Sequence, residues 1–186
     1  MVSRIMCSFR YLRQRWQQLR RHYWLALGID VAALVLVFSL ISHWQASSLL
    51  AADGSKHAPP FQLRGLDGAE YSLAASAGKT RLLYFFAPWC HVCALSAGNI
   101  ENLRRWRDEE VLAIYMIALS YDSEASVREF ASKHELHVPV LLGNDELMRD
   151  YQIRGFPTYY VVDTAGQLQQ RALGYSTSVG LWWRTR

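Results

Sequence analysis

The sequence predicts an α/β domain, with a central sheet covered by helices on both sides, that follows one transmembrane helix. Two continuous apolar runs, RLLYFFA at 81–87 and VLAIYMIAL at 111–119, are typical of strands buried on both faces of a sheet. Segments with helical periodicity alternate with the strands from residue 61 onward, which is the pattern of α/β domains. An apolar stretch at 24–41 precedes all of these segments.

Composition and charge limit the class of protein. The chain has 186 residues, 51% of them hydrophobic and 13% aromatic, which predicts one folded domain with some length to spare. Residues 1–22 contain six arginines and no acid, so they supply more than the whole formal charge of +4. The remainder carries 14 basic and 16 acidic residues, a net charge of −2, and we therefore expect no nucleic-acid partner.

The N-terminal part divides into a basic cytoplasmic segment (1–22), a transmembrane anchor (23–44) and a linker (45–58). As a helix, residues 24–41 span roughly 27 Å at about 1.5 Å per residue, close to the thickness of the hydrocarbon core. Tyr23, Trp24 and Trp44 suit the two interfaces, and the arginine-rich flank predicts that the N-terminus is cytoplasmic. We expect a single-pass protein of the inner (cytoplasmic) membrane, with the lipid bilayer as a partner and the domain exported.

A cleaved signal peptide is the alternative to an anchor. The apolar stretch exceeds the usual 7–15 residues of such a peptide, and the basic region before it is long. Ala46-Ser47-Ser48 is only a weak cleavage site. An uncleaved anchor is therefore favoured, and both alternatives export the domain. The small and polar residues of 45–58, which lead into Pro59-Pro60, are typical of a linker.

The elements of the domain follow from local patterns. Residues 60–73 consist of two short extended pieces around a Leu66-Asp67-Gly68 turn, which predicts a hairpin. After the strand at 81–87, helical spacing runs from His91 to about Arg107, with apolar residues along one side at Leu95, Ile100, Leu103 and Trp106. The strand at 111–119 is followed by a helix at 123–136 that Ser123 caps.

The C-terminal third continues the alternation. After VPVLLG at 138–143, a short helix is expected near 145–152. Two strands at 158–163 and 167–174 form a pair joined by the Thr164-Ala165-Gly166 turn, and a last helix covers about 177–184.

Cys90-His-Val-Cys93 carries the chemistry, and three kinds of site compete for it. A zinc site needs a second ligand pair, and Cys7, the only other cysteine, falls on the cytoplasmic side of the anchor, so we expect no metal. A structural disulfide across two residues closes a small ring and removes little unfolded-state entropy. A redox pair is favoured because the motif follows a buried strand and opens a helix.

That position suits thiol–disulfide exchange. Cys90 falls at a helix N-terminus, where the macrodipole and free backbone N–H groups stabilise a thiolate, and Cys93 lies one turn later, where it can resolve a mixed disulfide. Trp89 is expected to shield the site and offer a docking surface, or else to be a core aromatic. His91, when protonated, would stabilise the Cys90 thiolate and raise the reduction potential; the alternative is an exposed polar residue with a small effect.

Phe156-Pro157 completes the pattern, because a proline immediately before a strand marks irregular backbone and is often cis. With the cysteine pair, it makes residues 59–184 resemble the thioredoxin superfamily. Within that superfamily the chain is similar to the TlpA-like, membrane-anchored periplasmic thiol–disulfide oxidoreductases. It looks most like their protein disulfide oxidoreductase branch, which is associated with suppression of copper sensitivity.

The resemblance implies a thioredoxin-like fold over 59–186, a central mixed sheet with an N-terminal β-hairpin and a central insertion at 120–143. It implies a Cys90–Cys93 redox disulfide with Cys90 as nucleophile and Cys93 as resolving cysteine, and Pro157, after Phe156, as a cis-proline facing them. Implied partners are substrate proteins with thiols or disulfides and a membrane or periplasmic redox donor or acceptor, without a cofactor.

The sequence departs from the family at two positions near the cysteines. Tyr84 stands where thioredoxin has a buried acid, and Ser96 stands where many haem-maturation relatives have a glutamate. Water or the Tyr84 hydroxyl would then have to manage the proton of Cys93.

The predicted function is that of an enzyme, a protein disulfide oxidoreductase, with the direction of electron flow left open. One alternative is a copper-binding metallochaperone module, although copper carriers of this fold resemble a pattern with three residues between the cysteines. A thiol peroxidase is less favoured, because Ala87 stands where that group has a threonine.

Overall fold

The computed structural model describes residues 23–37, 40 and 49–186, and it divides the chain into two compact units, Met1–Trp44 and Gln45–Arg186. In the first unit a helix with exposed side chains covers residues 23–37. None of the helices in the described part of the chain combines the length and the apolar character needed to cross a bilayer. The basic segment 1–22 and the C-terminal part of the predicted anchor lie outside the described residues, so the anchor stays a prediction.

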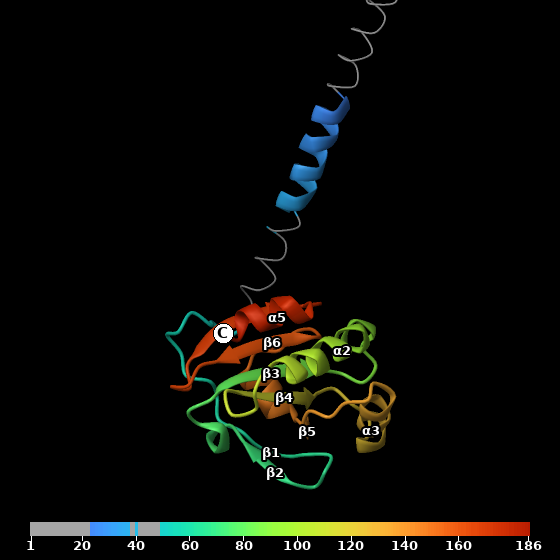
Figure 1. Ribbon diagram of the computed structural model, residues 1–186. Coiled ribbons are helices and arrows are strands. Elements are labelled where there is room, and N and C mark those ends of the chain that lie inside the picture. The colour runs from blue at the N-terminus through green and yellow to red at the C-terminus, as the bar shows by residue number, and fades with distance from the viewer. Residues whose placement is uncertain (1–22, 38–39, 41–48) are drawn as a thin grey trace, which may run out of the picture. The chain divides into compact units, whose positions relative to one another are not determined.

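The second unit is built on a five-stranded mixed sheet with the strand order β5-β4-β3-β6-β7 (Figure 1). Strands β3 (Thr80–Phe86), β4 (Leu112–Ala118) and β5 (Val140–Leu142) are parallel, whereas β6 (Thr158–Val162) and β7 (Leu168–Leu173) pair antiparallel. A separate antiparallel hairpin consists of β1 (Gln62–Arg64) and β2 (Glu70–Ser72) and leads into a short 3-10 turn, η1 (Ala74–Ser76). These strands confirm the predicted α/β class and the predicted hairpin.

Helices cover both faces of this sheet. They are α2 (His91–Trp106), α3 (Glu124–Lys133), α4 (Asp145–Asp150) and α5 (Ser178–Arg184). Ser123 caps α3 by accepting a hydrogen bond from the Ser126 N–H at 3.3 Å, as the sequence predicts. Each predicted helix of the domain is therefore present, with bounds that differ by up to three residues.

Alternating side chains of β3 divide the core into two layers. Leu82, Tyr84 and Phe86 belong to the layer covered by α2, α3 and α5, and Figure 1 shows α2 and α5 beside each other on that face. Leu83 and Phe85 belong to the other layer, with the hairpin and α4. The strand is thus buried on both faces, which explains its uninterrupted apolar sequence.

The apolar side of α2 differs from the prediction. Ile100 and Leu103 are fully buried, but Leu95 is 73% exposed and Trp106 is 52% exposed. At about 100° per residue, Leu95 lies roughly 140° around the helix from Ile100, so it cannot share the stripe that faces the sheet. The prediction that these four residues line one side is wrong for the two ends of the helix.

Residues 49–58, the described part of the predicted linker, pack against the domain. Leu49 and Leu50 are buried, the Arg171 guanidinium donates a hydrogen bond to the Leu49 carbonyl, and the Leu50 N–H donates to the Tyr160 hydroxyl at 3.0 Å. The Leu168 N–H donates to the Lys56 carbonyl at 2.8 Å. The chain therefore joins the domain along β7 ten residues before the proline pair at 59–60.

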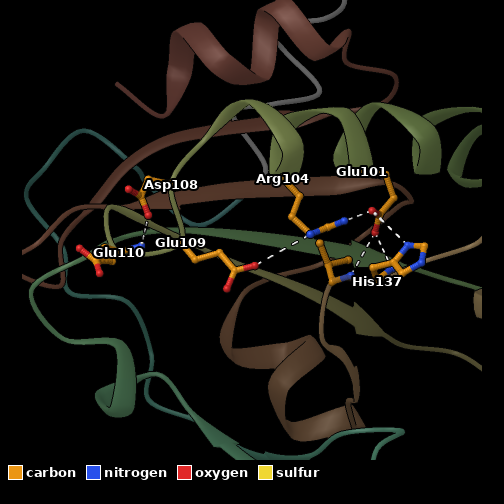
Figure 2. Close-up of polar contacts among 7 residues, drawn as sticks. Glu101, Arg104, Asp108, Glu109, Glu110 and His137 are labelled. Carbon is orange, nitrogen blue, oxygen red and sulfur yellow. Dashed lines mark hydrogen bonds and ion pairs between the residues drawn. The ribbon is translucent and has the colours of Figure 1, made fainter.

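A buried carboxylate ties α2 to the loop before β5 (Figure 2). Glu101 accepts hydrogen bonds from the N–H groups of His137 at 2.6 Å and Val138 at 3.0 Å, and from Arg104 Nε at 3.0 Å. Burial raises the pKa of Glu101, but the three donors lower it by more, so the carboxyl titrates below its usual range. These hydrogen bonds stabilise the ionised carboxylate and offset the free-energy cost of burying its charge.

Candidate functional site

Cys90 and Cys93 form a disulfide at the N-terminus of α2, with their Cα atoms 5.2 Å apart. Strand β3 ends at Phe86, and the Cys90 N–H donates to the Ala87 carbonyl at 3.0 Å, which closes the turn from strand to helix. Cys90 is the N-cap residue of α2, and its Sγ accepts a hydrogen bond from the Cys93 N–H at 3.1 Å. The sulfur therefore occupies the place where an N-cap side chain normally accepts.

The two sulfurs differ in access. Cys90 is 7% exposed, whereas Cys93 is completely buried. On reduction, a negative charge on Cys90 Sγ would meet the Cys93 N–H and the positive end of the α2 macrodipole. The arrangement favours attack through Cys90 from the solvent side, with Cys93 held behind it for the second step.

Trp89 and the loop before β6 border the disulfide. Trp89 is 62% exposed, so it is not a core aromatic; its Nε1 donates to the Ser120 carbonyl at 2.7 Å. Its ring meets the Phe156 ring edge to face, with the centroids 5.8 Å apart. The Phe156–Pro157 bond is cis, and the Pro157 carbonyl accepts from the Gly174 N–H at 2.8 Å. The aromatic pair thus brings the cis-proline loop beside the cysteine turn.

Hydroxyl groups, not carboxylates, lie behind Cys93. The buried Tyr84 hydroxyl donates to the Cys93 carbonyl at 3.2 Å, and the Ser96 hydroxyl donates to the Val92 carbonyl at 2.9 Å. Burial, with a smaller contribution from Tyr159, raises the pKa of Tyr84 far above its usual value, and the Ser96 hydroxyl only partly opposes this. Tyr84 therefore stays protonated and can donate a hydrogen bond, but it cannot act as a base for Cys93.

Tyr159 is a residue at this site that the sequence pattern did not single out. Its ring lies 4.9 Å from that of Tyr84, on the neighbouring strand β6. Its hydroxyl is buried and has no hydrogen-bond partner among the described residues. The two tyrosines meet because Tyr84 of β3 pairs directly with Tyr159 of β6, a strand far along the chain. A local pattern of residue types does not predict such a pairing.

A groove of about 600 Å³ opens beside the cysteine turn, between the first turns of α2 and one side of α3 along its length. We call it the α2–α3 groove. His91 is exposed on its rim, and its apolar walls include Trp89, Leu95 and Phe130. Burial, and to a smaller extent the charge of Lys133, lower the pKa of His134 in the same groove, so this imidazole is neutral near pH 7. The polar residues that line the groove are Asp122, Ser126, Glu129, Lys133 and His134.

The described residues contain no group of three or more His, Cys, Asp or Glu side chains that could hold a metal ion. The chemistry that the geometry offers is exchange at sulfur, with Cys90 the more accessible of the two cysteines and a neutral environment around Cys93.

Comparisons with known proteins agree with this chemistry. Residues 55–171 match the model of the AhpC/TSA family. The Thioredoxin-like protein YneN of Bacillus subtilis (strain 168) is 32% identical over 123 residues, which cover 66% of this chain and 72% of the relative. The Thiol-disulfide oxidoreductase ResA of Geobacillus kaustophilus (strain HTA426) is 25% identical over 141 residues, 75% of this chain and 80% of the relative.

A solved structure shares the fold. It is a putative Thiol:disulfide interchange protein DsbE from Chlorobium tepidum, with a TM-score of 0.66 and 20% sequence identity, over 72% of this chain and 96% of that one. The likeness extends over nearly the whole of that structure, and it shows that the fold is thioredoxin-like.

Proposed function

Because the chain belongs to the AhpC/TSA family and is a thiol–disulfide oxidoreductase, we propose that Cys90 and Cys93 carry its redox chemistry outside the cytoplasm. The observation that supports this most is the asymmetry of the pair. Cys90 Sγ lies at the N-terminus of α2 with a hydrogen-bond donor at 3.1 Å, and Cys93 is buried behind it. A single accessible sulfur next to a protected one is what a two-step exchange requires.

In the reducing direction, the Cys90 thiolate attacks one sulfur of a substrate disulfide. A mixed disulfide forms between Cys90 and the substrate, and the other substrate sulfur leaves as a thiolate. Cys93 then loses its proton and attacks Cys90 Sγ, which releases the second substrate sulfur and forms the Cys90–Cys93 disulfide. The substrate gains two electrons and the cysteine pair loses two; the oxidising direction is the same sequence in reverse.

The residues around the pair have supporting parts in this proposal. Trp89 and Phe156 form an aromatic pair next to the cysteine turn, with the cis Phe156–Pro157 bond, and they would offer a docking surface for the substrate backbone and side chains. His91 is exposed at the first residue of α2, where its positive form would stabilise the thiolate. Tyr84 holds the Cys93 carbonyl and so positions the resolving cysteine.

We assign the protein to the inner membrane, with residues 1–22 cytoplasmic, 23–44 as an uncleaved anchor, and the domain at 59–186 periplasmic. The six arginines before the apolar stretch support this orientation. Within its family we place the chain with the TlpA-like oxidoreductases, in the branch associated with copper-sensitivity suppression. Its partners would be exported proteins with thiols or disulfides, and a membrane or periplasmic donor or acceptor that recycles the pair.

The two alternative functions are not favoured. A copper module that used a histidine with the cysteine pair is not supported, because the described residues form no group of three or more His, Cys, Asp or Glu side chains. A thiol peroxidase would need a polar side chain at residue 87 in the turn before Cys90, where the chain has the fully buried Ala87.

Trapping of substrates tests the proposed function. The full chain with Cys93→Ser, expressed in its membrane, should accumulate mixed disulfides with exported proteins through Cys90, and mass spectrometry would identify them. The matched Cys90→Ser chain should trap none. Equal trapping by both variants, or capture of cytoplasmic proteins alone, would contradict the assignment.

The equilibrium potential of the pair against glutathione then decides the direction. A value near about −270 mV supports a reductant, and a value near about −120 mV supports an oxidant.

A further inference from the structure

The α2–α3 groove begins at the reactive sulfur and extends along α3. Cys90 is one of the residues that line it, whereas Phe156 and Pro157 are not, so the groove is separate from the cis-proline loop. The hydrogen bond from Trp89 Nε1 to the Ser120 carbonyl, at 2.7 Å, joins the cysteine turn to the loop before α3. A polypeptide that is disulfide-bonded to Cys90 therefore has this groove directly beside it.

The groove is acidic at the end that adjoins the cysteine turn. Asp122, two residues after Ser120, is exposed there, and it forms no ion pair with His91 on the α2 rim or with any other described cation. Glu129 and Lys133 lie one helical turn apart on α3, so their opposite charges largely offset each other. The carboxylate of Asp122 is therefore the charge that remains available to a bound molecule.

The apolar part of the groove combines a fixed side chain with an uncovered one. Phe130 of α3 is 5% exposed, and its ring centroid lies 4.8 Å from that of the buried Phe86, so the core holds it in place. Leu95 of α2 lines the same groove and is 73% exposed. A large apolar side chain between Leu95 and Phe130 would remove Leu95 from water without moving the core, which is a favourable binding arrangement.

We propose that the α2–α3 groove is a specificity site for substrate proteins, which binds the extended segment next to the attacked cysteine. A basic residue of that segment pairs with Asp122, and a large apolar residue lies between Leu95 and Phe130. The inference rests on the proposed function, because it takes Cys90 as the attacking sulfur. The preferred substrates are then proteins whose reactive cysteine has basic and large apolar residues beside it in the sequence.

The length of α3 sets how many substrate residues the groove can contact. The helix has 10 residues and so spans roughly 14 Å along its axis, at about 1.5 Å per residue. An extended chain covers that distance in about four residues at roughly 3.5 Å each. Contacts over these residues hold the substrate disulfide against Cys90 Sγ, and they should raise the rate constant for formation of the mixed disulfide.

The test measures how fast the reduced chain attacks short peptides of defined sequence. The full chain with Cys7→Ser, in detergent, retains Cys90 and Cys93 as its two thiols. Each peptide has one cysteine in a mixed disulfide with thionitrobenzoate; the Cys90 thiolate bonds to the peptide sulfur, and the coloured thionitrobenzoate leaves as a thiolate with the electron pair of the broken bond. Lysine or glutamate flanks the cysteine on both sides, and phenylalanine or alanine lies two residues further out on both sides, so the direction of the peptide does not matter.

The charge preference is tested at Asp122. The chain with an unaltered groove should react with the lysine peptides at least about threefold faster than with the glutamate peptides, a ratio that exposed ion pairs can produce. Asp122→Lys should reverse this order, whereas a misfolded chain would lose both rates without reversing them. Asp150→Lys makes the same change of charge at an exposed residue of α4, outside the groove, and should keep the lysine peptides preferred.

The apolar preference is tested at Leu95. Leu95→Ser should slow the reaction with the phenylalanine peptides about fivefold and leave the alanine peptides within about twofold of the unaltered groove. Trp183→Ser is the matched control, because it removes a similarly exposed apolar side chain from α5, outside the groove. It should leave the rates of both kinds of peptide unchanged.

Each other outcome overturns the inference. Equal rates for all peptides, with thionitrobenzoate released from every one, would remove the specificity site and leave the oxidoreductase in place. Reversal by Asp150→Lys as well would assign the preference to the overall charge of the domain, and slowing by Trp183→Ser as well would indicate non-specific adsorption. A reduced chain that sediments as a dimer, and that Leu95→Ser makes monomeric, would assign the groove to a second copy. No release from any peptide, or equal release by Cys90→Ser, would contradict the proposed function itself.

Discussion

The two halves of helix α2 differ in the charge of their buried polar groups. At its first turns, the buried Cys93 is accompanied by the neutral hydroxyls of Tyr84 and Ser96. In its second half, the buried Glu101 carries a full negative charge that three donors stabilise. Glu101 is the one buried carboxylate among the described residues, and it lies eight positions beyond Cys93, roughly 12 Å along the helix at about 1.5 Å per residue.

This difference indicates that the first turns of α2 serve the redox chemistry, whereas its second half serves the stability of the fold. Glu101 is occupied by its donors and too distant to take a proton from Cys93. Tyr84 is close, but its raised pKa keeps it protonated. We therefore expect the proton of Cys93 to leave to water or to the departing substrate thiolate, and we expect the charged half of α2 to contribute to folding rather than to exchange.

The largest expected effect is the loss of activity on substitution of Cys90, at the N-terminus of α2. Cys90→Ser should abolish insulin reduction, a loss of at least about a thousandfold, because no other accessible sulfur is held at the helix N-terminus. Glu101→Gln should keep the turnover of the wild type wherever it remains folded. Cys7→Ser serves as the control for a cysteine outside the pair. A Cys90→Ser chain with substantial turnover would refute the assignment of the nucleophile.

At the charged end, Glu101→Gln should lower the free energy of unfolding by about 2 kcal/mol, because an amide cannot accept from all three donors. Urea unfolding of the full chain in detergent measures this. Glu109→Gln is the matched control: its carboxylate is exposed, lies 4.0 Å from Arg104, and should contribute less than about 0.5 kcal/mol. Equal losses from both substitutions would contradict a special role for the buried carboxylate.

The same carboxylate should make stability depend on pH. The pKa of Glu101 in the folded protein lies below its ordinary value of 4.5, so its stabilisation is fully present above that value and is lost as the pH falls through the folded pKa. The difference in unfolding free energy between the wild type and Glu101→Gln should therefore shrink below pH 4.5. A difference that stays constant over this range would show that the lost contact is not ionic.

The smallest effect concerns Tyr84. Tyr84→Phe should cost about 1 kcal/mol of stability, because the hydrogen bond to the Cys93 carbonyl is lost. Turnover should change by less than about threefold, with an unaltered pH profile, since a tyrosine with a raised pKa supplies no base. Tyr160→Phe is the control for a buried hydroxyl in the other core layer; it removes the hydrogen bond to the Tyr151 carbonyl and also the acceptor of the Leu50 N–H, so its loss of stability should be larger. Loss of a titration step only in Tyr84→Phe would assign it the proton transfer.

Local patterns were sufficient for most elements of the domain. The buried strands at β3 and β4, the hairpin and the Ser123 cap are each specified by residues close together in the chain. The redox pair was predictable for the same reason, because Cys90 and Cys93 lie three residues apart at the start of α2, shortly after a buried strand.

Other features depended on parts of the chain that are far apart. Residues 49–58 have the composition of a linker, yet they pack along β7 because Arg171 and Leu168 supply hydrogen-bond partners from more than a hundred residues away. Leu95 and Trp106 fit a helical apolar pattern, but only the placement of α2 on the sheet decides that both face solvent.

The sequence by itself therefore determined the α/β class, the order of the elements and the thiol chemistry of Cys90 and Cys93. Only the tertiary structure decided that Tyr159 lies against Tyr84, that the ionised Glu101 accepts hydrogen bonds from a distant loop, and that Arg186 lies beside two tryptophans of α5. The physical reason is the range of the interactions. Secondary structure and capping are set within a few residues, whereas burial and pairing of side chains depend on which distant strands and helices meet.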